Sequence, residues 1–139
     1  MASEKNTNNF LDWRSKLILV GIAIGGALGS VLRYLVQVQL IHWFGSQYPY
    51  GTLLVKVVGS LLIGFLSFVL VEHVSVSEEI RFAILVGVLG GFTTFSTFSL
   101  DTLNFILQGN YSVAMGNVLL NVGVCLLACF LGLSLARAI

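Results

Sequence analysis

The chain reads Gly90-Gly91-Phe92-Thr93-Thr94-Phe95-Ser96-Thr97-Phe98-Ser99 in the middle of an apolar region. Paired glycines and hydroxyl side chains loosen a helix, and the interior of a bilayer offers no water to a freed peptide group. Apolar residues lie on both sides, from Phe82 to Leu89 and from Leu103 to Leu107. We therefore expect an interrupted helix near the middle of a membrane span, which is where transporters and channels place ion sites.

Composition assigns the whole chain to the membrane class. Of its 139 residues 57% are hydrophobic and 9% are charged, and the mean hydropathy is +0.96, values far from those of a soluble domain. A span needs about 20 mostly apolar residues, and four windows qualify: Leu17 to Leu40, Thr52 to Val71, Ile80 to Asn104, and Val113 to Ala136. We predict an all-α protein of the plasma membrane, in which residues 1–16 are a tail and interfacial anchor and residues 17–139 form a four-span channel domain.

Other functional classes find little support. The links between the spans are too short for a soluble catalytic domain, and no nucleophile with a base, metal cluster or phosphate loop is visible, so we do not expect an enzyme. A net charge of +1 argues against a nucleic-acid partner. The alternative is a proton-coupled multidrug antiporter, which also has four short spans but needs a carboxylate inside the membrane. The acidic candidate, Asp101, follows Phe95 and Phe98 too late to lie at the midplane.

Basic residues favour one side of the membrane. Four spans place both termini on the same side as the link 72–81, and this side carries Lys5, Arg14, Lys16, Arg81 and Arg137. The loops on the opposite side contain no lysine or arginine. The positive-inside rule therefore predicts cytoplasmic termini.

The second and fourth spans each carry a polar stripe. Thr52, Lys56 and Ser60 follow one another at fourfold spacing, which suits a pore wall. A buried lysine needs an anion, a carbonyl cluster or a route to water, although this one could also stretch to the membrane surface. Asn117 and Asn121 are also four residues apart, in the fourth span. They could line a pore or form hydrogen bonds between helices.

The first span combines small residues with one arginine. Gly21, Gly25 and Gly29 make a smooth face that allows another helix to approach closely. Arg33 is a functional candidate because a charge within a span is costly. Alternatively, its side chain reaches the aromatic interfacial zone that follows it.

The residues after the paired glycines suit ions of either sign. Phe95 and Phe98 share a helical face, and aromatic rings are electropositive at their edges. A small, strongly hydrated anion could exchange water for ring edges, amide N–H groups and nearby hydroxyls, although phenylalanines at this spacing can also serve packing alone. If residues 90–94 are unwound, their carbonyl groups would attract a small monovalent cation.

Three blocks carry a family resemblance. The residues Gly26 to Tyr34, Gly51 to Ser60, and Gly90 to Phe98 resemble the signature blocks of the Fluc fluoride channels, also called CrcB proteins. The resemblance implies passive, fluoride-selective export through an antiparallel dimer with two pores and a structural sodium ion at its centre. It further implies backbone ligands for sodium at Gly90 and Thr93, pore phenylalanines at Phe95 and Phe98, a polar track through Ser96 and Thr97, and a pore entrance at Arg33.

Two positions depart from the family pattern. Lys56 stands where asparagine is usual, and Asn117 stands where tyrosine is common; both positions line pores in the family. Lysine could attract fluoride, hold it too tightly or block the passage, because conduction requires release as well as binding. An antiparallel homodimer is the default, since a symmetric midplane site needs a second broken helix. Together with the charge bias, however, Lys56 suggests a heterodimer with an opposite-orientation paralogue and one degraded pore.

Overall fold

The protein is a bundle of four long helical segments. A computed structural model describes residues 12–45 and 49–139, and no strand occurs within these ranges. Four segments are long and apolar enough to cross a membrane: Trp13–Phe44, Tyr50–His73, Glu78–Leu107 and Tyr111–Arg137. The predicted all-α, four-span fold is confirmed. Each segment extends beyond its predicted window because the helices continue into the polar residues that flank the apolar core.

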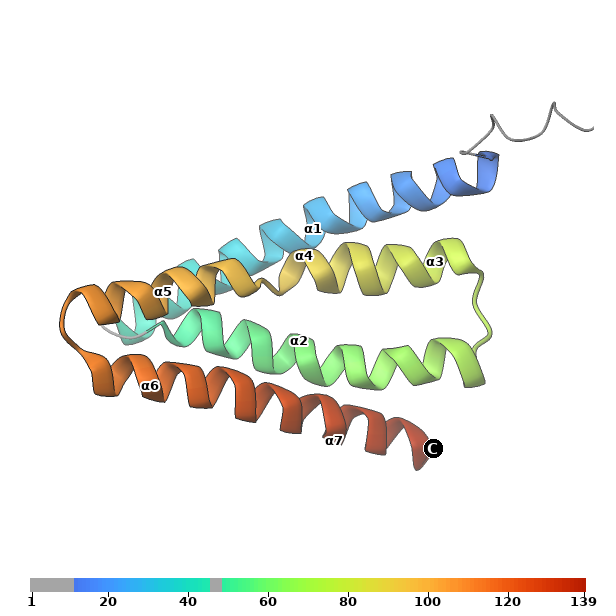
Figure 1. The fold of residues 1–139 in the computed structure, drawn as a ribbon. Helices are drawn as coiled ribbons and strands as arrows, with labels where there is room; N and C mark the ends of the chain where they lie inside the picture. The colour runs from blue at the N-terminus through green and yellow to red at the C-terminus, as the bar shows by residue number, and fades with distance from the viewer. Residues whose placement is uncertain (1–11, 46–48) are drawn as a thin grey trace, which may run out of the picture.

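The helical elements follow one another as shown in Figure 1. The first span is α1 (Trp13–Phe44), and the second is α2 (Tyr50–Phe68) with the π-helical segment η1 (Val69–His73). The third comprises α3 (Glu78–Phe82), π-helical η2 (Ala83–Leu89), α4 (Gly90–Phe92) and α5 (Phe95–Leu107). The fourth comprises α6 (Tyr111–Leu119), π-helical η3 (Leu120–Val124) and α7 (Cys125–Arg137).

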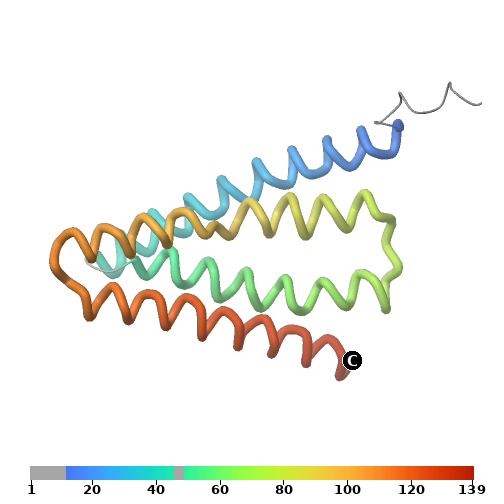
Figure 2. Tube along the Cα trace, viewed as in Figure 1, coloured from blue at the N-terminus to red at the C-terminus, as the bar shows by residue number. Residues whose placement is uncertain are grey.

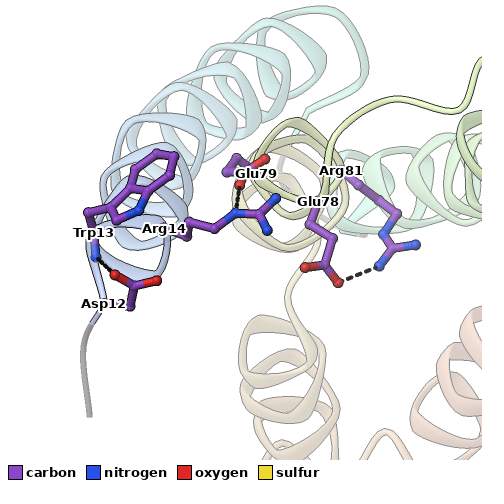
Figure 3. A network of polar contacts seen from close by, with 6 residues as sticks. All are labelled: Asp12, Trp13, Arg14, Glu78, Glu79 and Arg81. Carbon is purple, nitrogen blue, oxygen red and sulfur yellow. Dashed lines mark hydrogen bonds and ion pairs between the residues drawn. The ribbon is translucent and has the colours of Figure 1, made fainter. Parts of the chain in front are cut away.

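Helix α1 begins earlier than predicted. Residues 13–16, expected in the interfacial anchor, form its first turn; the rest of that anchor, residues 1–11, lies outside the described residues. The Asp12 carboxylate accepts the N–H of Trp13 at 2.7 Å, and Arg14 Nε lies 3.2 Å from Glu79 Oε1 (Figure 3). A capped helix start that is paired with α3 explains why this polar segment is helical rather than a surface turn.

The predicted smooth face of α1 is confirmed. Helix α1 runs beside the first half of the third span (Figure 1). A Cβ atom at Gly25 would lie 2.5 Å from the carbonyl oxygen of Ala83, and one at Gly29 would lie 2.8 Å from the backbone nitrogen of Phe92. Glycine is therefore required here because backbone meets backbone.

The second and fourth spans also pack closely through glycines. Helices α2 and α7 lie side by side (Figure 1), and Gly64 faces the backbone of Cys129 while Gly132 faces the backbone of Leu61. The chain trace in Figure 2 places the start of α1 and the end of α7 at the same end of the bundle as the link between η1 and α3. This is the arrangement expected for four spans.

The third span is broken at two residues near its middle. Thr93 and Thr94 are extended, with φ/ψ of −94°/145° and −146°/139°. The broader unwinding considered for residues 90–94 does not occur, because residues 90–92 remain helical. Gly91 is needed for packing instead, since a Cβ there would lie 2.6 Å from the carbonyl oxygen of Gly26.

Candidate functional site

The break is held in place by the second span. A Cβ atom at Gly59 in α2 would overlap the methyl group of Thr93 and lie 3.4 Å from the ring of Phe92. The Thr93 hydroxyl donates to the carbonyl of Leu89 at 3.0 Å, and the Thr93 N–H bonds to the same oxygen at 2.9 Å. The missing side chain at Gly59 therefore provides the space in which the chain leaves the helix.

Two helix ends of opposite polarity meet at the break. The last turn of α4 presents carbonyl groups that have no partner further along the helix, and the first turn of α5 presents free N–H groups. These ends carry partial negative and partial positive charge respectively. The Thr94 and Ser96 hydroxyls contact each other at 2.8 Å beside the second end. The site can thus attract a cation on one side and an anion on the other.

The two phenylalanines after the break form an edge-to-face pair. Their ring centroids are 5.2 Å apart and the ring planes meet at 64°. Phe98 is 6% exposed, whereas Phe95 is 71% exposed on the surface of the chain. The three-residue spacing therefore does bring the rings together, but only Phe98 is enclosed within a single chain.

Lys56 turns inward to these rings. Its Nζ atom lies 4.1 Å from the ring centroid of Phe98 and 5.6 Å from that of Phe95. The residue is 9% exposed, so its side chain does not stretch to the membrane surface. An ammonium group over the electron-rich ring faces is a cation–π arrangement.

A cavity of about 350 Å³ lies against this group, and we call it the aromatic cavity. Its walls come from α2, the break, α5, η3 and α7, and they are formed by Lys56, Gly59, Ser60, Ile63, Thr93, Thr94, Phe95, Phe98, Asn121, Val122, Cys125 and Leu126. Asn121 is 5% exposed, and its amide nitrogen donates to the backbone and side-chain oxygens of Asn117, both at 2.9 Å. Its own side-chain oxygen has no hydrogen-bond partner among the described residues.

Asn117 lies between helices and does not contribute to the walls of the aromatic cavity. It is 1% exposed, and its amide nitrogen donates to the Thr102 hydroxyl at 2.9 Å. Thr102 in turn donates to the carbonyl oxygen of Phe98 at 2.8 Å. The predicted hydrogen bonding between helices is present, here between α5 and α6, and a place on a pore wall stays a prediction.

A second cavity of about 570 Å³ lies at one end of the bundle, and we call it the carboxylate cavity. Its polar lining includes Gln37, Thr52, Thr97 and Asp101. The Thr52 hydroxyl donates to Asp101 Oδ2 at 3.2 Å and receives the amide of Gln37 at 3.5 Å. Sequence reasoning considered Asp101 only as a proton site and did not assign Gln37, although an acid within a span was a usable signal.

The remaining predicted site residues are spread over the bundle. Thr97 faces the carboxylate cavity, and Ser96 is exposed at the start of α5. Arg33 is half-buried on α1, contributes to the walls of neither cavity, and makes no ion pair within the part of the chain that the structure describes. The structure therefore gathers Lys56, Phe95, Phe98 and Asn121 at one place, with Thr97 at a neighbouring one.

Comparison with known proteins assigns the chain to a family. Residues 20–133 match the family described as CrcB-like protein, Camphor Resistance (CrcB). The chain is 44% identical over 118 residues to the fluoride-specific ion channel FluC of Magnetococcus marinus, covering 85% of this chain and 96% of that protein. It is 46% identical over 122 residues to FluC of Rhizobium meliloti, covering 88% and 96%. FluC of Methylococcus capsulatus is 47% identical over 121 residues, covering 87% of this chain and 53% of that protein. With four helices able to span a membrane and a match over most of its length, the chain is a multi-pass membrane protein that belongs to the CrcB family.

Proposed function

We propose that the chain is a subunit of a fluoride-selective channel, which lets fluoride leave across the plasma membrane passively, down its gradient. The observation that carries this proposal is the edge-to-face pair of Phe95 and Phe98 directly after the helix break, beside a mostly apolar cavity that contains a few polar side chains. Ring edges and free N–H groups can replace the water of a small anion. The names of the relatives, fluoride-specific ion channels, support the same ion.

The polar stripe of α2 supports a path for the anion. Thr52 lines the carboxylate cavity, and Lys56 and Ser60 line the aromatic cavity one and two turns further along the helix. In the path we propose, fluoride passes the hydroxyl of Thr97 and then the aromatic pair. The remaining pore residues are Ser96, Lys56 and Asn121, with Arg33 near an entrance. Asn117 supports the path through its hydrogen bond to α5.

An antiparallel dimer would complete this path. Phe95 is 71% exposed in the single chain although it borders the aromatic cavity. A second copy in the opposite orientation would cover this ring and bring a second break to the same level, as a symmetric midplane site requires. The homodimer is the simplest assembly of this kind.

A structural sodium ion fits the residues at the break. The extended backbone at Thr93 and Thr94 leaves the last carbonyls of α4 without helical N–H partners. Carbonyl oxygens suit a hard monovalent cation, and Gly90 is exposed on the surface of the chain while Thr93 is half-buried. Gly90 and Thr93 of each chain would hold the ion, which would supply positive charge that ties the two breaks together.

A heterodimer is the second candidate assembly. Lys56 places an ammonium on the aromatic pair of this chain's own pore, and the basic residues favour one end of the bundle. An opposite-orientation paralogue could supply the conducting pore while this chain contributes a degraded one. A non-conducting structural role for this chain would be the extreme form of that arrangement.

An ion-release assay tests the proposed function. The purified full chain is reconstituted into liposomes loaded with either potassium fluoride or potassium chloride, and valinomycin starts the efflux. We expect fluoride release well above that of protein-free liposomes, with chloride retained. Release of both anions at similar rates would contradict a fluoride-selective channel, and release of neither would exclude conduction by the homodimer.

A further inference from the structure

We propose that the Lys56 ammonium is an anion ligand, so that the aromatic cavity retains a small monovalent anion on the proposed path. The inference deepens the proposed function, because the choice of fluoride as the anion rests on it. The ammonium itself, its burial and its surroundings belong to this chain and are independent of that choice.

The ammonium group lacks a hydrogen-bond acceptor within the described part of the chain. Lys56 is 9% exposed, and a lysine carries three N–H donors. Its contacts in the structure are the two ring faces, with Nζ 4.1 Å and 5.6 Å from the centroids. Cation–π contacts stabilise an ammonium group by less than its removal from water costs. The aromatic cavity beside the ammonium has room for a further ligand that stabilises the charge.

Asp101 attracts the ammonium electrostatically but does not form an ion pair with it. Asp101 lies one turn beyond Phe98 on α5, and its carboxylate accepts the hydroxyl of Thr52 at 3.2 Å. Neither ion pair in the described chain includes Lys56 or Asp101, since both join residues at the other end of the bundle. The ammonium is left facing the aromatic cavity without a paired carboxylate.

The cavity contains polar groups that could hold an anion and its water beside the ammonium. Asn121 lines the same space with a buried oxygen that has no partner among the described residues. Ser60 and Thr94 add hydroxyls that can either donate or accept. A partly hydrated fluoride would provide partners for both the ammonium and the Asn121 oxygen. The anion would accept hydrogen bonds from the ammonium and the hydroxyls, and its remaining water would donate one to the Asn121 oxygen. The cavity, at about 350 Å³, has room for the ion with water.

Retention follows from the fixed charge. An anion beside an ammonium in a poorly solvated site is held more strongly than one beside neutral amides. Conduction requires the ion to leave as well as to enter. Lys56 should therefore increase the occupancy of the site and decrease the rate at which fluoride leaves it, and a neutral amide at this position should do the reverse.

Fluoride titration of four full-length proteins tests the inference. The proteins are the wild type, Lys56→Asn, Lys56→Arg and the control Lys16→Asn, which removes an exposed lysine at the start of α1. Binding of sodium fluoride and, separately, of sodium chloride is followed by calorimetry in detergent, and fluoride efflux is measured in liposomes. We expect Lys56→Asn to bind fluoride at least tenfold more weakly, equivalent to about 1.4 kcal/mol, and to release it faster. Lys56→Arg and Lys16→Asn should retain the wild-type affinity.

The outcomes separate this inference from the proposed function. Equal fluoride affinity in the wild type and a monodisperse Lys56→Asn would show that the lysine only packs against the rings, and would overturn the inference while leaving conduction intact. A Lys56-dependent affinity in a protein that never conducts would support the inference and contradict the channel. Chloride bound as tightly as fluoride would overturn the assignment of the site to fluoride. If Lys56→Asn does not fold, the comparison passes to Lys56→Met, with the same expected loss of affinity.

Discussion

The paired phenylalanines Phe95 and Phe98 have different surroundings in this chain. Phe98 is enclosed by its own chain, where Lys56 covers its ring and Thr102 bonds to its carbonyl oxygen. Phe95 packs edge-to-face with Phe98 but is 71% exposed. One ring is therefore positioned by intramolecular contacts, whereas the other depends on whatever covers the surface beside the aromatic cavity.

Replacing the enclosed ring should abolish most of the fluoride flux. In Phe98→Leu an aliphatic side chain of similar bulk remains, but the electropositive ring edge that replaces the water of the anion is lost. We expect fluoride efflux from liposomes to fall at least tenfold while the protein remains monodisperse in size-exclusion chromatography. The control is Phe130→Leu in α7, which removes an exposed ring that lines neither cavity. Equal efflux from Phe98→Leu and the wild type would exclude a role for the ring in permeation.

Residue spacing predicted some of these contacts and not others. The pairing of Phe95 with Phe98 follows from three-residue helical spacing alone, because both rings belong to one helix. The position of the Lys56 ammonium could not be predicted, since its long side chain can reach either the membrane surface or the rings. Asn117 and Asn121 share a helical stripe, yet Asn117 donates a hydrogen bond to α5 whereas Asn121 lines the aromatic cavity. That difference depends on the register of the neighbouring helices, which spacing within one helix does not contain.

The third span changes its neighbour at the break. Its first half packs on α1 through backbone contacts at glycines, and its second half, α5, packs on α6 (Figure 1). The glycine spacing of α1 predicted the first contact. It did not predict that Gly90 and Gly91 would remain helical, because a glycine pair serves close packing as readily as unwinding.

Close packing of α1 on the third span makes one glycine indispensable. A Cβ atom in Gly29→Ala would overlap the backbone at Val88 and lie 2.8 Å from the nitrogen of Phe92, so the helices must separate. We expect a cost of about 1–3 kcal/mol, visible as a lower melting temperature of the detergent-solubilised protein. Gly123→Ala is the matched control, because a Cβ atom there would meet nothing within 4 Å and alanine favours the helix. Equal melting temperatures of the two variants would show that α1 and the third span are not closely packed.

The bundle as a whole is electrically asymmetric along its length. Its basic end carries Arg14, Lys16, Arg81 and Arg137, and two of these arginines pair with Glu79 and Glu78 (Figure 3). The sequence of the opposite loops contains no lysine or arginine. Orientation in the membrane responds to lysine and arginine rather than to net charge, so the carboxylates do not cancel this bias. An antiparallel homodimer, however, needs chains inserted in both directions.

The charge bias therefore leads to a prediction about assembly. We expect the chain expressed alone to insert mainly with its C-terminus in the cytoplasm, as reported by a C-terminal green fluorescent protein fusion that fluoresces and an alkaline phosphatase fusion that stays inactive. Adding positive charge to the opposite loop with Gln108→Lys and Asn110→Lys, and removing it with Lys16→Gln and Arg137→Gln, should shift the population toward the reverse orientation. If the wild type shows a single orientation, antiparallel pairing requires a paralogue inserted the other way, and fluoride efflux should increase when such a partner is co-expressed. Strong signals from both fusions of the wild type would instead contradict the predicted orientation and support the homodimer, because two opposed copies would then be present in one membrane.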